Sequence, residues 1–188
     1  MTAIVETPTV TRHWGCTVLS HQHSLAGLVR PAASALHQGD GPWTQLPLTD
    51  LIADEAGLYE LFRTGMGVLS DAGTGGGFSG RRPGGIDLSL QVWNAGYELP
   101  QSSTPGDFIG WLFLEATEPN HIDSGTVAVY DPRAGSAMTA MPGLPWGRQL
   151  TVRPRPGNLT IVPGWLTNAV QPVEEGQSIT VVVATSAP

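Results

Sequence analysis

Two short motifs in this sequence have the spacing of metal ligands. His121-Ile-Asp123 and His21-Gln-His23 each place two donor side chains one residue apart. A three-ligand site needs a further imidazole or carboxylate, yet no His, Lys or Arg occurs after Arg155. The first motif also lies within EPNHIDSG, which is typical of a hairpin loop between two strands. We therefore interpret both pairs as solvated loop residues and expect no metal at either.

Other catalytic groups are sparse. The chain has no Lys, which excludes Schiff-base chemistry. Ser102 or Ser103 could pair with His121 as nucleophile and base, but no nucleophile-elbow pattern surrounds them. Glu98 and Asp107 could act as general bases only if burial raised their pKa values, and carboxylates in turns are usually solvated.

Three further polar side chains have simpler interpretations. Tyr97 and Tyr130 could donate a hydrogen bond to a substrate carbonyl, although Tyr130, just before Asp131-Pro132, is more typical of packing at a strand end. Cys16 lies in an apolar strand pattern, which favours a buried and unreactive thiol.

The charge of the chain argues against nucleic acid or a membrane surface as a partner. Sixteen acidic residues against nine basic ones give a net charge of -7, whereas polyanions are bound by clustered cations. The small basic cluster of Arg148, Arg153 and Arg155 is expected to pair with surface carboxylates. No signal-peptide pattern, membrane span or cysteine pair is visible, so we expect a cytoplasmic protein.

The elements that must position these groups begin with one strand and two helices. Hydrophobic spacing predicts a strand over 9–20 and helices over 24–36 and 50–66. Asp50 can cap the second helix, and Gly65 and Gly67 are expected to end it.

A glycine-rich segment, DAGTGGGFSGRRPGG, follows at 71–85. Seven glycines in fifteen residues disfavour regular structure. The segment is interpreted as a surface loop or as a lid in which Phe78, Arg81 and Arg82 could close over a pocket. A phosphate-binding loop is disfavoured because no Gly-Lys-Ser/Thr follows.

From Ile86 the sequence becomes a series of short strands separated by turns. They read IDLSLQVWN, FIGWLFLEA, GTVAVYDP, QLTVRP, NLTIVP and SITVVVAT. Their spacing and turn residues predict an antiparallel sandwich or barrel. We expect a mainly β single domain over 1–188, in which 1–70 packs on a core of 86–188.

The segment 109–184 resembles the 2-oxoglutarate/Fe(II) oxygenase family. The resemblance is carried by GWLFL from Gly110, GTVAVYDPR from Gly125, RPGNLTIVPGWLTNAVQP from Arg155 and SITVVVA from Ser178. It implies a double-stranded β-helix, the jelly-roll fold of the cupin class, with a few N-terminal helices.

The resemblance also implies an iron site that this sequence cannot build. Family members hold iron with a His-x-Asp or His-x-His pair and a distal His, which here fall on Gln101, Ser103 and Asn168. The Arg that anchors the co-substrate falls on Ser178, or on Gln177 in the adjacent register. Neutral amides and hydroxyls are poor Fe(II) ligands, and no guanidinium fork is present for a carboxylate. We therefore expect neither metal nor cofactor.

A jelly-roll of this kind can enclose a ligand cavity. Gln101, Asn168 and Gln177 are expected to orient and polarise a substrate there. The expected binding surface is larger and mostly aromatic: Trp93, Ser103, Trp111, Trp146, Trp165, Tyr97 and Phe78.

Confinement together with neutral donors suits intramolecular cyclisation. The sequence therefore predicts a cofactor-independent cyclase or isomerase, such as a Diels–Alder-type catalyst, acting on an apolar small molecule in specialised-metabolite biosynthesis. Two alternatives remain open, a non-catalytic protein that binds a small molecule or a partner and an oxygenase with unusual ligands. A homodimer is compatible with this architecture.

Overall fold

The computed structural model describes residues 8–13, 15–31, 41–72, 84–133 and 149–186. Phe78, Trp146, Arg148 and most of the glycine-rich segment lie outside these ranges. The lid interpretation of 71–85 therefore stays a prediction.

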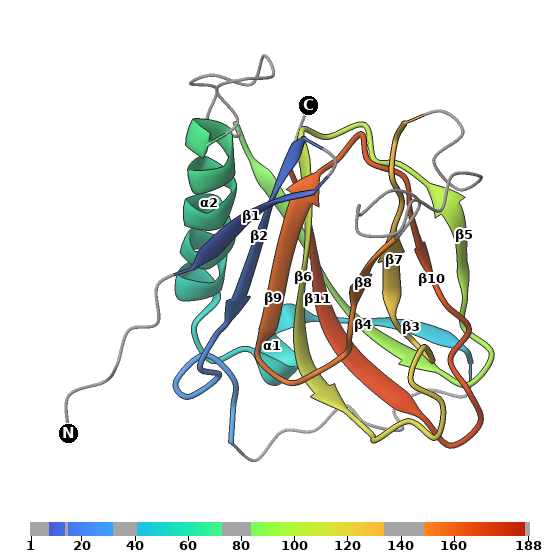
Figure 1. Ribbon diagram of the computed structural model, residues 1–188. Coiled ribbons are helices and arrows are strands. Elements are labelled where there is room, and N and C mark those ends of the chain that lie inside the picture. The colour runs from blue at the N-terminus through green and yellow to red at the C-terminus, as the bar shows by residue number, and fades with distance from the viewer. Residues whose placement is uncertain (1–7, 14, 32–40, 73–83, 134–148, 187–188) are drawn as a thin grey trace.

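The described chain forms two antiparallel sheets (Figure 1). The larger has the strand order β1-β2-β9-β6-β11-β4-β3 and the smaller β5-β10-β7-β8. The bounds are β1 Thr9–His13, β2 Cys16–Gln22, β3 Trp43–Leu46, β4 Ile86–Asn94, β5 Leu99–Ser102, β6 Phe108–Ala116, β7 Val127–Val129, β8 Leu150–Val152, β9 Asn158–Pro163, β10 Asn168–Val170 and β11 Ser178–Ser186.

The last eight strands form a double-stranded β-helix. β9-β6-β11-β4 face β5-β10-β7-β8, and every strand-to-strand connection from β4 onward except β7–β8 crosses between the sheets. Two facing four-stranded antiparallel sheets with this crossing pattern are the jelly-roll arrangement. The mainly β, cupin-like fold class predicted from the sequence is confirmed.

The N-terminal part enlarges this barrel on its outer side. β1 and β2 extend the large sheet beyond β9, and β3 extends it beyond β4. Helices α1, Leu48–Leu51, and α2, Glu55–Ala72, lie beside the sheet, with α2 along its outer face (Figure 1). Neither helix has the length and apolar character needed to cross a bilayer within the described residues.

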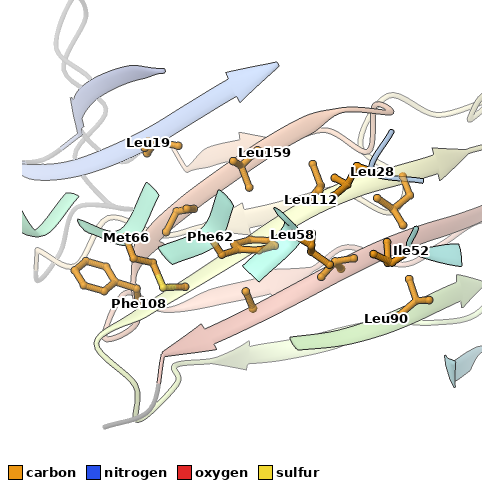
Figure 2. Close-up of a cluster of buried hydrophobic side chains, with 14 of the residues drawn as sticks. Leu19, Leu28, Ile52, Leu58, Phe62, Met66, Leu90, Phe108, Leu112 and Leu159 are labelled. Atoms are coloured by element: carbon orange, nitrogen blue, oxygen red, sulfur yellow. The ribbon is translucent and has the colours of Figure 1, made fainter. Parts of the chain in front are cut away.

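The large sheet and α2 enclose one hydrophobic cluster, which we call the outer core. Figure 2 shows Phe62 and Met66 of α2 packed toward Leu112 of β6 and Leu159 of β9. All four side chains are at most 1% exposed. Burial on this scale is the main favourable term that holds α2 against the sheet.

The observed limits of α2 differ from the predicted ones. Asp54, not Asp50, caps the helix, because its Oδ1 accepts the backbone N–H of Gly57 at 2.8 Å. The helix then continues through Gly65 and Gly67 instead of ending there. A Cβ on Gly65 would lie 2.5 Å from Ile161 Cδ1, so this glycine permits close packing of α2 on β9.

The helix predicted over 24–36 is wrong for its described part. Residues 24–31 form turns and isolated bridges, including Val29 to Ile52. The backbone groups bond to the chain around α1, with Arg30 N–H donating to Leu51 O and Ala53 N–H to Leu28 O. These tertiary bonds replace the local helical ladder that the apolar spacing had indicated.

The two α2 glycines provide a matched pair of variants. Gly67→Ala is expected to raise the free energy of unfolding by about 0.5–1 kcal/mol, since nothing lies within 4 Å of a Cβ there. Gly65→Ala is expected to lower it by about 1–3 kcal/mol through overpacking against Ile161. Urea titrations of both variants measure the difference; a stabilising Gly65→Ala would show that α2 is not closely packed on β9.

Candidate functional site

The space between the two sheets, which we call the barrel interior, is lined by alternate residues of each strand. Phe113 and Trp111 of β6 face it, as do Val181 of β11, Val129 of β7 and Val170 of β10. Residues between them along β6 and β11 belong to the outer core. This two-residue period makes the inward positions identifiable.

An aromatic group and a polar chain run along the inner face of β4. Trp93 stacks on Tyr97 with ring centroids 5.2 Å apart and meets Phe113 edge-on at 6.2 Å. Its indole N–H donates to Gln91 Oε1 at 2.9 Å, and Gln91 Nε2 donates to Ser89 Oγ at 3.1 Å. The hydrogen bonds fix these rotamers, so the aromatic surface is preorganised.

The inner face of β4 is not fully buried. Ser89, Gln91 and Tyr97 are only partly buried although they face inward, and Val183 of the neighbouring β11 is partly exposed as well. This inner face is therefore partly accessible to solvent.

Asn168 lies at the beginning of β10 and faces the interior. It is 3% exposed, and its Cα pairs with Ser102 of β5 and Val129 of β7. Its Nδ2 donates to Leu166 O at 3.3 Å, a long bond that uses one of the two amide hydrogens. Among the described residues, the second hydrogen and the amide oxygen have no hydrogen-bond partner.

Gln101 does not join Asn168 inside the barrel. The register between β5 and β10 shifts by one residue, so that Ser102 pairs with Asn168 while Gln101 lies beside Ala169 on the opposite face. Gln101 is exposed, as is Ser103, and Trp165 is 45% exposed. This corrects the expectation that these three side chains line the cavity; of the predicted tryptophans, the structure places Trp93 and Trp111 inside.

Gln177 closes the opposite end of the barrel. Its Oε1 accepts a hydrogen bond from Ser124 Oγ, which in turn accepts the backbone N–H of Glu174 at 2.9 Å. Since Ser124 precedes Val129, the pairing partner of Asn168, by five residues, Gln177 is on the order of 15 Å from Asn168. Gln177 and Asn168 therefore do not act on one substrate atom.

Gln177 also has a buried Nε2 without a hydrogen-bond partner among the described residues. The sequence interpretation did not single out Ser124, because only the fold brings it to Gln177. We interpret the pair as a structural plug at this end of the barrel.

The residues at the family's iron and co-substrate positions do not fit those groups. Gln101 and Ser103 are exposed, and Asn168 provides only an amide. Ser178 Oγ donates to Asn94 Oδ1 at 2.8 Å and provides no cation for a carboxylate. We derive no step through iron or 2-oxoglutarate.

The side chains of the two sequence motifs with ligand spacing are exposed or only partly buried. His121 and Asp123 are exposed in the turn before β7, where Asp123 N–H donates to His121 Nδ1 at 3.3 Å. Burial lowers the pKa of His23, and the adjacent His21 lowers it further. The described residues contain no group of three or more His, Cys, Asp or Glu side chains able to hold a metal ion.

Two charged side chains that the sequence did not single out, Asp131 and Arg133, act on Cys16. The Asp131 side chain is 2% exposed and accepts both a backbone and a side-chain hydrogen bond from Arg133. Burial raises the pKa of the Cys16 thiol, the Asp131 carboxylate raises it further, and Arg133 opposes the change. These effects keep the thiol protonated, as an unreactive core cysteine would be.

No family model matches the sequence, and no curated protein matches it significantly. Solved structures do resemble the fold. A prolyl-4-hydroxylase from Pseudomonas putida is 14% identical with a TM-score of 0.46, covering 78% of this chain and 67% of its own. A 2OG-Fe(II) oxygenase family oxidoreductase from Burkholderia pseudomallei is 12% identical with a TM-score of 0.43, covering 95% of this chain and 71% of its own.

A cupin superfamily protein from Desulfitobacterium hafniense is more distant, at 12% identity and a TM-score of 0.33, covering 55% of this chain and 68% of its own. These are likenesses of fold. The strand order of this chain gives the double-stranded β-helix independently of them. No substrate or cofactor follows from them for this chain.

The structural role of the Ser124–Gln177 pair can be tested by measuring the free energy of unfolding. Ser124→Ala removes the donor to Gln177 and the acceptor for Glu174 N–H, leaving buried polar groups without partners. The free energy of unfolding is expected to fall by about 1–3 kcal/mol in urea titration. Ser103→Ala, at an exposed position, is the control and is expected to change it by less than about 0.5 kcal/mol; equal effects would contradict a closing role for Ser124.

Proposed function

We propose that this chain binds an apolar small molecule in the barrel interior without Fe(II) or 2-oxoglutarate, and promotes its intramolecular cyclisation or isomerisation. The observation that carries the proposal is that the barrel interior combines aromatic side chains of the large sheet, Trp93 and Phe113, with the neutral amides of Gln91 on β4 and Asn168 on β10 of the facing sheet. A Diels–Alder-type cycloaddition in specialised-metabolite biosynthesis is the reaction of this class that suits it best.

Shape would provide most of the rate enhancement. A flexible chain held in a reactive conformation gains effective molarity, worth up to roughly 7–11 kcal/mol of the barrier in well-oriented reactions. The Trp93–Tyr97–Phe113 group is held by stacking, by edge contact and by the bond to Gln91, so it resists rearrangement on binding. Rigid aromatic walls lower the entropic cost of fixing an apolar substrate.

Asn168 would provide the polar contribution. One hydrogen of its Nδ2 is held by Leu166 O, which fixes the orientation of the amide, and the other can donate to a substrate carbonyl. A preorganised donor stabilises charge that develops on that oxygen in the transition state. Gln101 is exposed and Gln177 belongs to the plug, so neither takes this role.

Two alternatives make different predictions. A binding protein without catalytic activity would hold the same ligand and release it unchanged. An oxygenase would require Fe(II) at positions 101, 103 and 168, and their side chains do not provide a facial triad.

Binding to the interior is tested with the neutral fluorescent probe Nile red. Ser89→Trp fills the partly accessible inner face of β4 and is expected to weaken binding at least about tenfold, or ~1.4 kcal/mol. Thr11→Trp, on the exposed β1, adds the same side chain elsewhere and is expected to leave binding unchanged. Dialysis against a chelator should also have no effect; equal probe binding by both variants would place the probe outside the barrel.

Catalysis is tested with linear polyenes that carry a diene and a dienophile, with products separated by chiral chromatography. Asn168→Leu keeps the approximate volume but removes the donor, and is expected to lower kcat by about 10²-fold with a smaller change in KM. Thr64→Leu, at an exposed position of α2 on the outer face of the large sheet, is the control. Substrate recovered unchanged would favour the binding protein, whereas turnover that depends on added Fe(II) and 2-oxoglutarate would refute metal-independent action.

A further inference from the structure

A groove of about 590 Å³ lies at the plugged end of the barrel, away from Asn168. Its walls are the chain leaving β6 and the chain between β8 and β9. Its lining residues are Ala116, Thr117, Glu118, Pro119, Asn120, Ile122, Arg153, Pro154, Arg155 and Pro156. A volume of this size is typical of small-molecule sites.

The wall that carries the two arginines is held rigidly by its backbone. Asn158 binds both ends of it, its Nδ2 donating to Arg153 O at 2.9 Å and its backbone N–H to Arg155 O at 2.9 Å. Gln22 Nε2 donates to Pro156 O at 2.7 Å from the neighbouring strand β2. These bonds fix the backbone that carries Arg153 and Arg155, and none of them uses a guanidinium.

The opposite wall is fixed just as firmly. Thr117 N–H donates to Ser178 O at 3.0 Å, and Ser178 N–H donates to Thr117 Oγ1 at 2.8 Å. The Glu174 carboxylate accepts the backbone N–H groups of Asn120 and His121. Both walls are therefore formed before any ligand arrives.

The groove contains two cationic side chains, Arg153 and Arg155, although the protein as a whole is acidic. Arg153 and Arg155 are exposed, and the ion pairs among the described residues are formed by other arginines, Arg63 and Arg133. The sequence-based expectation that Arg153 and Arg155 pair with surface carboxylates is therefore wrong. Glu118 is the one carboxylate among the lining residues.

Apolar groups adjoin these cations. Ile122 is 62% exposed within the groove, and Pro119 and Pro156 lie beside it in the lining. A large exposed aliphatic side chain next to two cations without ion-pair partners indicates a ligand with both characters.

We propose that this groove binds an amphipathic anion. Arg153 and Arg155 would hold its oxyanion head, a carboxylate or a phosphate, through their planar donor forks. Its apolar body would lie on Ile122, Pro119 and Pro156. The site is separate from the barrel interior, so it does not depend on the function proposed for that interior.

The test measures binding of octyl phosphate and octanoate by calorimetry, below their micellar concentrations. Arg153→Gln/Arg155→Gln is expected to weaken binding of the preferred anion at least about tenfold, and added salt should weaken binding to the unmodified protein. Arg12→Gln/Arg30→Gln removes the same charge from exposed positions elsewhere and should have little effect. The tighter of the two anions identifies the head group.

Three further measurements separate the contribution of the anionic head group to binding from that of the apolar body. Octanol should not bind measurably, inorganic phosphate should bind much more weakly than the octyl anions, and Ile122→Ser should weaken only ligands with an alkyl chain. Circular dichroism confirms folding of each variant. The proposal is overturned if neither anion binds, if the two double variants weaken anion binding equally, or if octanol binds as tightly as the anions.

Discussion

The structure depends on burial of the large sheet on both of its faces. Along β6, Leu112 packs into the outer core under α2 while Trp111 and Phe113 face the barrel interior. β11 behaves in the same way, with Val182 on one side and Val181 on the other. A strand buried on both faces cannot shift by one residue without exchanging its two side-chain sets, so this packing fixes the register of the whole barrel.

The buried polar side chains of the barrel include Thr160 on β9, Asn168 on β10, and Ser124 and Gln177 at one end. At one end Ser124 and Gln177 share a hydrogen bond, while Gln177 Nε2 is buried without a partner among the described residues. Near the beginning of β10, Asn168 is buried with only part of its amide engaged. Both amides are therefore only partly engaged among the described residues, and they differ in the atom that is bonded, the oxygen of Gln177 and the nitrogen of Asn168.

The two proposed sites differ in chemistry. The interior offers aromatic carbon and neutral donors, which suit an uncharged substrate. The groove offers the exposed side chains of Arg153 and Arg155 on a backbone held by hydrogen bonds, which suit an anion. The groove lies near the Trp93 end of the interior, because its lining residue Ala116 pairs with Ile179, which also pairs with Trp93.

The sequence by itself determined the strands whose pattern is local. IDLSLQVWN, FIGWLFLEA and NLTIVP coincide with β4, β6 and β9, because short runs rich in β-branched and aromatic residues between turn residues indicate strands. The sequence also determined the donor types at positions 101, 103 and 168, since these do not depend on packing.

Only the tertiary structure decided how distant residues combine. β5 and β10 are four and three residues long, too short for a periodic signal, and their irregular register turned Gln101 outward. Gln177 forms a hydrogen bond with Ser124. Gly65, which was expected to end α2, instead lies within the helix and packs closely against Ile161. In each case the deciding partner lies more than 50 residues away in the chain, and local propensity carries no information about such pairings.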